Sequence, residues 1–244
     1  MKRILILLMV SVILLPLLAV SVHSGDLPAS VSYHGQAGKI CAVYITGIGC
    51  GSCAVTDPLL LSEFLEKYPD LIIIEYEIYR DRKSNMDIAD RYFRNYLPLT
   101  SPGMPLLIFD KGNSFLGKIN ILDSEETIKN SGSNECPLIQ GPVSFEDLYL
   151  VSLPGKPKVW AQNRVLISEA TDGEGDSKLL KKLLLSRDLS SDLEGVTFEK
   201  IEARPVQISR GTIEFDEAIK IGEWILQWRD GKRKVSDSIE EVVE

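Results

Sequence analysis

The sequence predicts an α/β protein in which a smaller α/β unit follows a main one. Short apolar runs rich in β-branched residues alternate with segments whose apolar residues recur at helical spacing, and this alternation indicates strands connected by helices. The apolar fraction of 44% is typical of a globular protein, and 244 residues suffice to bury a core in each unit.

The main unit spans residues 38–131 and has the order β-α-β-α-β-β-α. Its first strand is the apolar run KICAVYITG and its second is LIIIEYEIY. Between them, apolar residues recur at helical spacing up to Pro69, which ends that helix. Asp123 with Glu126 resembles a capping box that opens the last helix. We expect strands at 39–47, 71–79, 105–110 and 114–121, and helices at 54–68, 85–97 and 124–130.

Turn-forming residues separate this unit from the second one. The predicted linker covers 132–156, the second α/β unit covers 157–231, and a charged tail, 232–244, is expected to lack structure. Within the second unit we expect strand 159–167, helix 177–187, strand 196–203, a hairpin through Arg210 and Gly211, and helix 216–229.

Residues 1–24 are typical of an export signal peptide. Lys2 and Arg3 precede a nearly uninterrupted apolar stretch, and small residues lie before a cleavage point at Gly25. The stretch is also long enough to remain as an N-terminal membrane anchor, because a hydrocarbon core is about 30 Å thick. In both cases we expect an extracytoplasmic body, secreted or in a periplasm-like space, where disulfides persist.

Cys50 and Cys53 are separated by two residues and lie where the first strand meets a helix. The free N–H groups and positive dipole end of that helix stabilise a thiolate at Cys50, and the thiolate is the reactive form. Cys53, one turn further on, can attack a mixed disulfide and release the substrate. We therefore predict a redox-active pair in which Cys50 attacks and Cys53 resolves.

Two other interpretations of this pair are a zinc clip and a passive staple. Zinc sites usually use a second ligand pair at regular spacing, and Cys41, Cys136, His23 and His34 form no such pair. A disulfide across two residues closes a loop too small to stabilise much. We therefore predict a working dithiol that uses no metal and no cofactor.

Residues 38–131 resemble the thioredoxin family in more than the CxxC motif. The element order is similar, Pro58 matches the proline that kinks the family's active-site helix, and GMPLLIFDKGNSFLGKI resembles its cis-proline, strand, turn and return strand. The resemblance implies that Pro105 is cis beside the dithiol and that the backbone of Met104 pairs with substrate. It also implies a thioredoxin-like fold for residues 38–131. The strand-helix-strand-Pro-hairpin-helix order of the appended domain can be interpreted as a cysteine-free copy of that fold.

The motif departs from the usual pattern of that family. Gly49 replaces a tryptophan, Tyr44 stands where the family has a buried acid, and Gly-Ser separates the cysteines where proline is usual. No histidine lies in the motif, so one charge that would stabilise the Cys50 thiolate is missing. Less thiolate stabilisation makes the disulfide less oxidising, which favours a reductase or isomerase over an oxidase.

Cys41 and Cys136 flank the main unit. Cys41 falls in its first strand, and Cys136 follows its last helix. They either form a structural disulfide or remain as a small buried apolar residue and a free thiol. Four cysteines are too few for a disulfide scaffold in a chain of this length.

These observations predict an exported thiol-disulfide oxidoreductase that acts on protein disulfides through Cys50 and Cys53. The expected partners are protein thiol or disulfide clients and a membrane electron donor or acceptor. The net charge of −8 argues against nucleic acid, whose phosphates would repel the chain. One alternative is a non-catalytic thioredoxin-like binding or chaperone module, which would tolerate loss of Cys50. Another is a membrane-tethered electron carrier that serves one partner.

Overall fold

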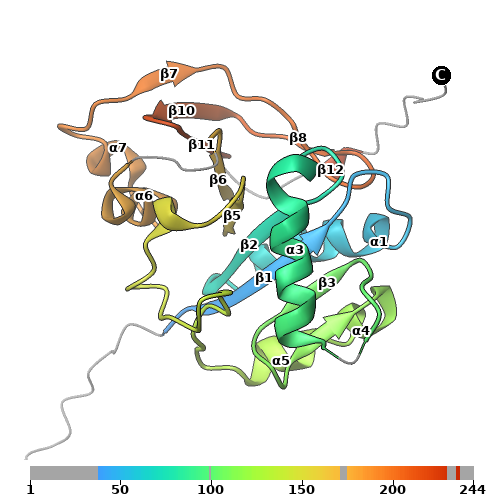
Figure 1. Ribbon diagram of the computed structural model, residues 1–244. Coiled ribbons are helices and arrows are strands. Elements are labelled where there is room, and N and C mark those ends of the chain that lie inside the picture. The colour runs from blue at the N-terminus through green and yellow to red at the C-terminus, as the bar shows by residue number, and fades with distance from the viewer. Residues whose placement is uncertain (1–37, 99, 171–174, 230–234, 237–244) are drawn as a thin grey trace, which may run out of the picture. The chain divides into compact units, whose positions relative to one another are not determined.

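The computed structural model describes residues 38–98, 100–170, 175–229 and 235–236. Within these residues the chain is mixed α/β: nine strands form one mixed sheet, three short strands form another, and helices pack on the large sheet (Figure 1). The α/β fold class predicted from the sequence is therefore confirmed. The predicted leader, residues 1–24, lies outside the described residues.

Four strands from the main unit lie at one end of the large sheet. β1 (Ile40–Thr46) runs parallel to β2 (Leu71–Glu77). β3 (Leu106–Ile108) pairs antiparallel with β1 on its other side, and β4 (Ser114–Leu116) pairs antiparallel with β3. The order β4-β3-β1-β2 places β1 inside the sheet, and the CxxC segment follows directly from its end.

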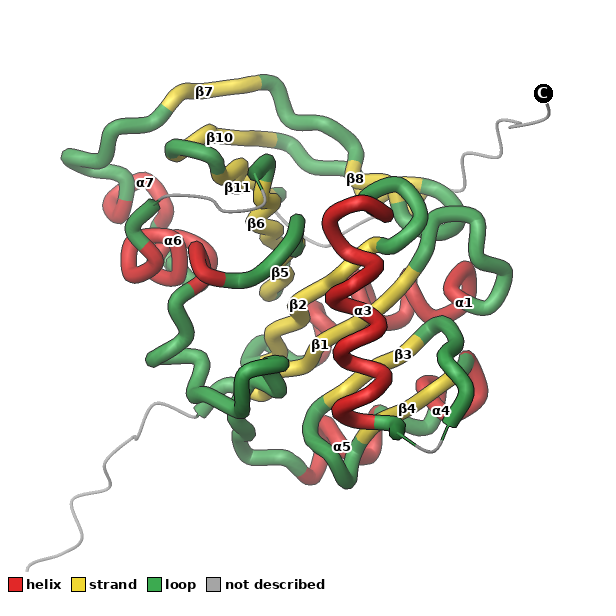
Figure 2. The backbone as a smooth tube through the Cα atoms, viewed as in Figure 1, coloured by secondary structure: helices red, strands yellow, loops and turns green. Residues whose placement is uncertain are grey.

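Strands from residues 157–229 extend the same sheet (Figure 2). β5 (Lys158–Ala161) pairs antiparallel with β2, and the Lys158 ammonium forms a 2.7 Å ion pair with the buried carboxylate of Glu75. Beyond β5, in spatial order, lie β6 (Arg164–Ser168), β11 (Trp224–Trp228), β10 (Glu217–Ile221) and β7 (Glu199–Ile201). One continuous ladder of backbone hydrogen bonds therefore joins the residues of both predicted units.

The helix after the dithiol changes its hydrogen-bond pattern at Pro58. α1 (Cys53–Pro58) ends there, and the chain continues as a π-helical segment, η1 (Leu59–Phe64), and a last turn, α2 (Leu65–Lys67). Proline has no N–H to donate, so regular α-helical bonding is interrupted at this point. The other described helices are α3 (Arg82–Tyr96), α4 (Lys118–Leu122), α5 (Glu125–Asn130), η2 (Leu150–Ser152), α6 (Ser177–Leu184) and α7 (Leu189–Asp192).

The small sheet has the order β12-β9-β8. β8 (Val206–Gln207) and β9 (Thr212–Ile213) form the hairpin predicted through Arg210 and Gly211. β12 (Val235–Ser236) pairs with β9, so the expectation that the tail lacks structure is wrong for these two residues. The sequence pattern did not indicate this strand, because residues 235–236 become a strand only by pairing with the free edge of β9.

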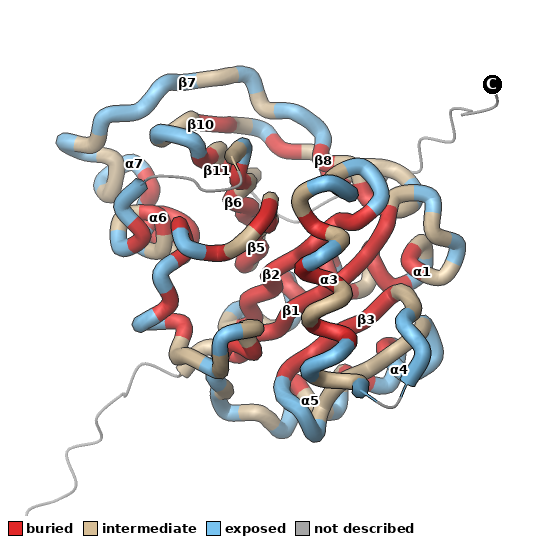
Figure 3. The backbone as a smooth tube through the Cα atoms, in the orientation of Figure 1, coloured by how far each residue is buried: buried red, intermediate tan, exposed pale blue. Residues whose placement is uncertain are grey.

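The core lies on both faces of the large sheet (Figure 3). Along β1, Cys41, Val43 and Ile45 enter a cluster with residues of α3 and α6, whereas Ala42 and Tyr44 enter a cluster with residues of η1. Every residue of β1 is buried. Because β1 is packed on both faces, it holds the start of the CxxC segment in a fixed position.

The predicted helix 216–229 is wrong, because these residues form the β10–β11 hairpin. A two-residue turn, Gly222–Glu223, connects the strands, and Gly222 has a φ of 59°. Glycine in a two-residue turn adopts the left-handed backbone that a twisted hairpin requires. The apolar spacing that suggested a helix is equally compatible with two short strands rich in isoleucine and tryptophan.

Other element boundaries also differ from the predictions. The return strand 114–121 ends at Gly117, whose φ is 83°, and residues 118–122 form α4. The expected strand 159–167 is the β5–β6 hairpin, which turns at Gln162 with a φ of 46°, and strand 196–203 is reduced to β7. The capping box of Asp123 and Glu126 does not form, because Ser124 caps α5 without a side-chain bond to its backbone N–H groups.

Candidate functional site

The CxxC pair lies in the turn between β1 and α1. Cys50 and Cys53 form a disulfide with an S–S distance of 2.15 Å and a Cα–Cα distance of 5.2 Å. The backbone N–H of Cys53, the first residue of α1, donates to the Sγ of Cys50 at 3.2 Å. This N–H is one that the helix leaves unpaired, and it stabilises negative charge on that sulfur when the pair is reduced.

The two cysteines differ in exposure. Cys53 is fully buried, whereas Cys50 is half-buried and lies between the exposed residues Gly49 and Gly51. Gly49 has a φ of 86°, which favours glycine, and a Cβ at either glycine would meet no atom within 4 Å. A second protein can therefore approach Cys50 closely, but it cannot reach Cys53.

Cys50 opens onto a surface groove of about 550 Å³. Apolar side chains form much of its wall, including those of Tyr79, Met86, Phe93 and Met104. Met104 is joined to the buried Pro105 by a cis peptide bond. The structure thus places Met104 in the same groove as Cys50.

Tyr79 is a large apolar side chain of the groove that protrudes into solvent, since it is 50% exposed. Its ring packs on the backbone of Gly47, where a Cβ would lie only 3.0 Å from a ring carbon. Any larger residue at position 47 would displace the ring. Gly47 therefore allows the ring of Tyr79 to pack close to the backbone and to line the groove beside Cys50.

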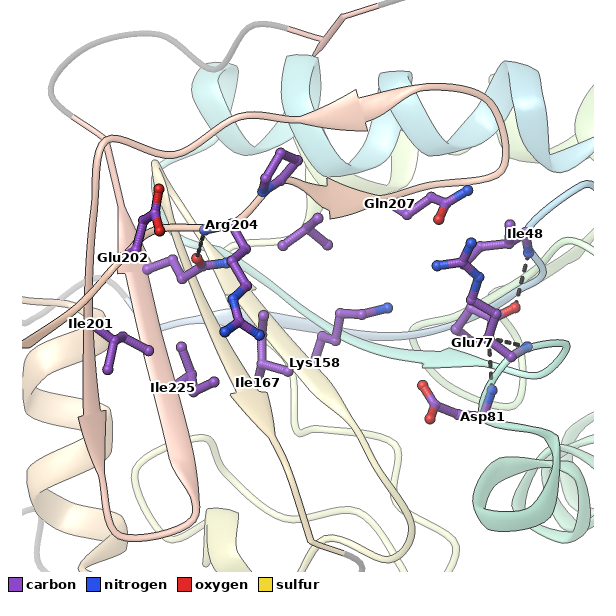
Figure 4. A pocket seen from close by; sticks show the side chains of 14 residues that line it. Ile48, Glu77, Asp81, Lys158, Ile167, Ile201, Glu202, Arg204, Gln207 and Ile225 are labelled. Carbon is purple, nitrogen blue, oxygen red and sulfur yellow. Dashed lines mark hydrogen bonds between the residues drawn. The ribbon is translucent and has the colours of Figure 1, made fainter. Parts of the chain in front are cut away.

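Glu77 links the two loops that border the groove, and Figure 4 shows this residue where it also lines a neighbouring pocket. The residue is 2% exposed, and its carboxylate accepts hydrogen bonds from four backbone N–H groups. Oε1 accepts from Ile48 and Tyr79 at 2.9 and 2.8 Å, and Oε2 accepts from Arg80 and Asp81 at 2.7 and 3.1 Å. One buried side chain thus joins the segment before Cys50 to the segment that carries Tyr79.

Asp57 is a second buried carboxylate, one helical turn after Cys53. Its Oδ1 accepts from the hydroxyls of Tyr44 and Thr46 at 2.6 and 2.7 Å. Burial raises the pKa of Asp57 above its ordinary value of 3.8, while hydrogen bonds from Tyr44, Ser209 and Thr46 act in the opposite direction. Burial and the neighbouring Asp57 also raise the pKa of Tyr44, so its hydroxyl stays protonated and can donate.

Ser209 brings the C-terminal part of the chain into the site. Its backbone N–H and its Oγ each donate to Oδ2 of Asp57 at 2.7 Å, and its carbonyl accepts from the N–H of Gly49 at 3.1 Å. Ser209 lies in the turn between β8 and β9. One residue therefore contacts the chain on both sides of the CxxC motif.

A second pocket, of about 230 Å³, also combines the two parts of the chain (Figure 4). Ile48 and Glu77 line it together with Arg204 and Gln227, and the backbone N–H of Arg204 donates to Gln227 Oε1 at 2.7 Å. The segment before Cys50 therefore borders residues 157–229 at this pocket as well as at Ser209.

Cys41 and Cys136 form a second disulfide, with both residues fully buried. Asn134 places Cys136 beside β1, because its side-chain amide exchanges hydrogen bonds with the backbone N–H and C=O of Cys41 at 2.7 and 2.8 Å. Cys136 also pairs with Val143 in an isolated bridge. No cysteine of the chain is free, and both cysteines of this disulfide are buried, whereas Cys50 is only half-buried.

The sequence interpretation did not identify Asp57, Glu77 or Ser209. Glu77 and Asp57 left a weak trace, because each is an acidic residue in a largely apolar segment. Ser209 left none, since its partner Asp57 is separated from it by 152 positions. Side-chain contacts of that separation follow from the tertiary fold and not from local pattern.

The described residues contain neither a cluster of metal ligands nor a membrane-spanning helix. No group of three or more histidine, cysteine, aspartate or glutamate residues in this part of the chain is placed to hold a metal ion. None of the described helices is long and apolar enough to cross a bilayer. Both histidines, His23 and His34, precede the described residues.

Comparison with known proteins identifies no relative. No protein-family model matches the chain, and it has no significant match among curated proteins or solved structures.

Proposed function

We propose that the chain is a thiol-disulfide oxidoreductase that acts on protein disulfides through Cys50 and Cys53. The observation that carries this proposal is the asymmetry of the pair. Cys50 lines a groove and its Sγ accepts a hydrogen bond from a backbone N–H at the start of a helix. Cys53, three residues later, is fully buried. An attacking thiol must meet a client, while a resolving thiol needs only to meet its partner cysteine.

The proposed reaction balances as two successive exchanges. The Cys50 thiolate attacks one sulfur of a client disulfide, which forms a mixed disulfide and releases the other client sulfur as a thiolate. The Cys53 thiolate then attacks the Sγ of Cys50, which closes the Cys50–Cys53 disulfide and releases the second client sulfur. The client gains two electrons, solvent supplies its protons, and the pair is oxidised.

The same proposal assigns residues 38–131 to a thioredoxin-like unit. The element order, the parallel β1–β2 pair and the position of the CxxC motif at the start of a helix support this assignment. The cis bond before Pro105 also agrees with the resemblance in sequence. In this assignment the backbone of Met104, which lines the groove, pairs with an extended segment of the client.

The groove favours clients whose cysteines lie among apolar residues. Tyr79, Met86 and Phe93 offer apolar contact area next to Cys50, and burying such area drives association. Apolar residues around a disulfide are accessible in unfolded or misfolded chains. This chemistry fits a reductase or isomerase of protein disulfides.

The proposed location is outside the cytoplasm, with electrons supplied by a membrane thiol reductant. Both disulfides support an oxidising compartment, because disulfides persist there and are rare in the cytosol. A dithiol in such a compartment needs a reductant to act repeatedly as a reductase. The motif carries no histidine to raise its oxidising power, which favours the reductive direction.

Trapping of mixed disulfides tests the assignment of the two cysteines. Cys53→Ser removes the resolving thiol, so this variant should accumulate a covalent complex with a reporter peptide that holds one disulfide flanked by apolar residues. Cys50→Ser should form no such complex, because Cys53 is fully buried. Non-reducing electrophoresis and mass spectrometry measure both outcomes.

Two results would count against the proposal. Trapping that survives the loss of Cys50 would move the attacking thiol elsewhere. Equal binding of the reporter by wild type and by Cys50→Ser, with no exchange in either protein, would favour the non-catalytic binding module.

A further inference from the structure

The turn between β8 and β9 restrains both ends of the CxxC segment. The carbonyl of Ser209 holds the N–H of Gly49, the residue before Cys50. The N–H and hydroxyl of the same residue hold the carboxylate of Asp57, one turn after Cys53. These contacts fix the segment that must bring the two sulfurs together.

The turn is itself fixed to the body of the protein. Val206, Ile208 and Ile213 are buried in the cluster that contains Leu60 and Leu61 of η1. The N–H of Ile208 donates to the carbonyl of Gly211, which closes the hairpin. Ser209 is therefore presented from a packed element and not from a free loop.

Asp57 transmits the restraint to β1. While Oδ2 receives both donors of Ser209, Oδ1 receives the hydroxyls of Tyr44 and Thr46. The buried carboxylate is thus bonded on one side to the strand that precedes the motif and on the other to the β8–β9 turn. Glu75 of β2, paired with Lys158 of β5, is another buried carboxylate, and it interacts electrostatically with Asp57.

We propose that Ser209 is a positioning residue of the dithiol, which holds Gly49 and Asp57 so that Cys50 and Cys53 are pre-arranged to form their disulfide. This inference rests on the proposed function. The Cys50–Cys53 disulfide and the hydrogen bonds of Ser209 to Gly49 and Asp57, here called the clamp, restrain the same segment. Each restraint favours the other, because the second costs less entropy once the first is in place. The coupling is reciprocal, so reduction of the disulfide loosens the clamp.

The equilibrium between the Cys50–Cys53 pair and glutathione measures this pre-arrangement without any protein client. Ser209→Ala removes the Oγ donor and leaves both backbone contacts. Because hydrogen bonds to charged groups are among the stronger ones, we expect the equilibrium constant for disulfide formation to fall about fivefold. Ser209→Thr keeps the hydroxyl and should restore it.

Ser144→Ala is the matched control. Ser144 Oγ donates to the carboxylate of Asp147 at 2.8 Å, so this change removes a serine–aspartate bond of the same kind within a separate turn. Its equilibrium constant should equal that of wild type. Amide hydrogen exchange gives a second measurement: the N–H of Gly49 should exchange faster in the reduced wild-type protein than in the oxidised one.

The inference is overturned if folded Ser209→Ala keeps the wild-type equilibrium constant, if Ser209→Thr does not restore it, or if Ser144→Ala lowers it equally. Unchanged exchange at Gly49 on reduction would also overturn it. The proposed function fails separately, in the trapping experiment with the reporter peptide. Glutathione exchange can show the clamp even when no protein disulfide is reduced.

Discussion

At the scale of single residues, Asp57 makes stability depend on pH in a direction opposite to that of most carboxylates. Burial raises the pKa of Asp57 above 3.8, so the folded protein keeps this proton at pH values where the unfolded chain has lost it. Its stabilising contribution is complete below about pH 3.8 and is lost as the pH rises through the folded pKa.

The variant Asp57→Asn should remove this part of the dependence. Its unfolding free energy should decline less than that of wild type as the pH rises above about 4, although the amide cannot accept equally from Ser209 and overall stability should be lower. Burial also raises the pKa of Glu75, so wild type and variant share a residual slope of the same sign. Urea denaturation at a series of pH values measures the difference, and parallel curves would contradict this prediction.

At the scale of elements, the hairpin of β10 and β11 depends on one turn. Gly222 has a φ of 59°, a conformation that costs a β-branched residue much more than glycine or asparagine. Gly222→Val should therefore lower the unfolding free energy by about 1–2 kcal/mol. Gly222→Asn, which tolerates the left-handed region, should cost clearly less. Denaturation midpoints measure both, and equal losses would mean that side-chain bulk rather than backbone conformation decides.

Element length explains why the sequence predicted one half of the molecule better than the other. β1, β2 and α3 have long, uniform apolar patterns, and the CxxC segment and Pro105 stand out by residue type, so they could be located directly. Turn residues predicted the β8–β9 hairpin, but β7 and β12 contain only three and two residues, too few to carry a period. Such strands exist because neighbouring backbone pairs with them, which only the folded chain determines.

The residues of the candidate site also fall into those that the sequence could identify and those that it could not. Cys50, Cys53 and Met104 belong to recognisable motifs that lie within the first half of the chain. Asp57 and Ser209 meet only because the hairpin of the C-terminal part packs on η1, as the buried side chains of Val206 and Ile213 show. A contact that depends on the packing of distant elements leaves no local pattern in the sequence.

At the scale of the whole molecule, two disulfides restrain the chain very differently. The Cys41–Cys136 disulfide spans 95 positions and connects β1 to the segment after α5. The Cys50–Cys53 disulfide spans three positions. Because both residues of the long-range disulfide are fully buried and Cys50 is not, an added thiol should reduce the short one first.

The double variant Cys41→Ala/Cys136→Ala should therefore lose stability but keep its redox chemistry. The chain-entropy estimate for a disulfide that spans 95 positions is about 4–5 kcal/mol, against about 2 kcal/mol for one that spans three. We expect the double variant to unfold at a much lower urea concentration than Cys50→Ser/Cys53→Ser, while it alone still exchanges with glutathione. If it loses exchange while still folded, Cys41 and Cys136 take part in electron transfer, and their assignment as a purely structural pair is wrong.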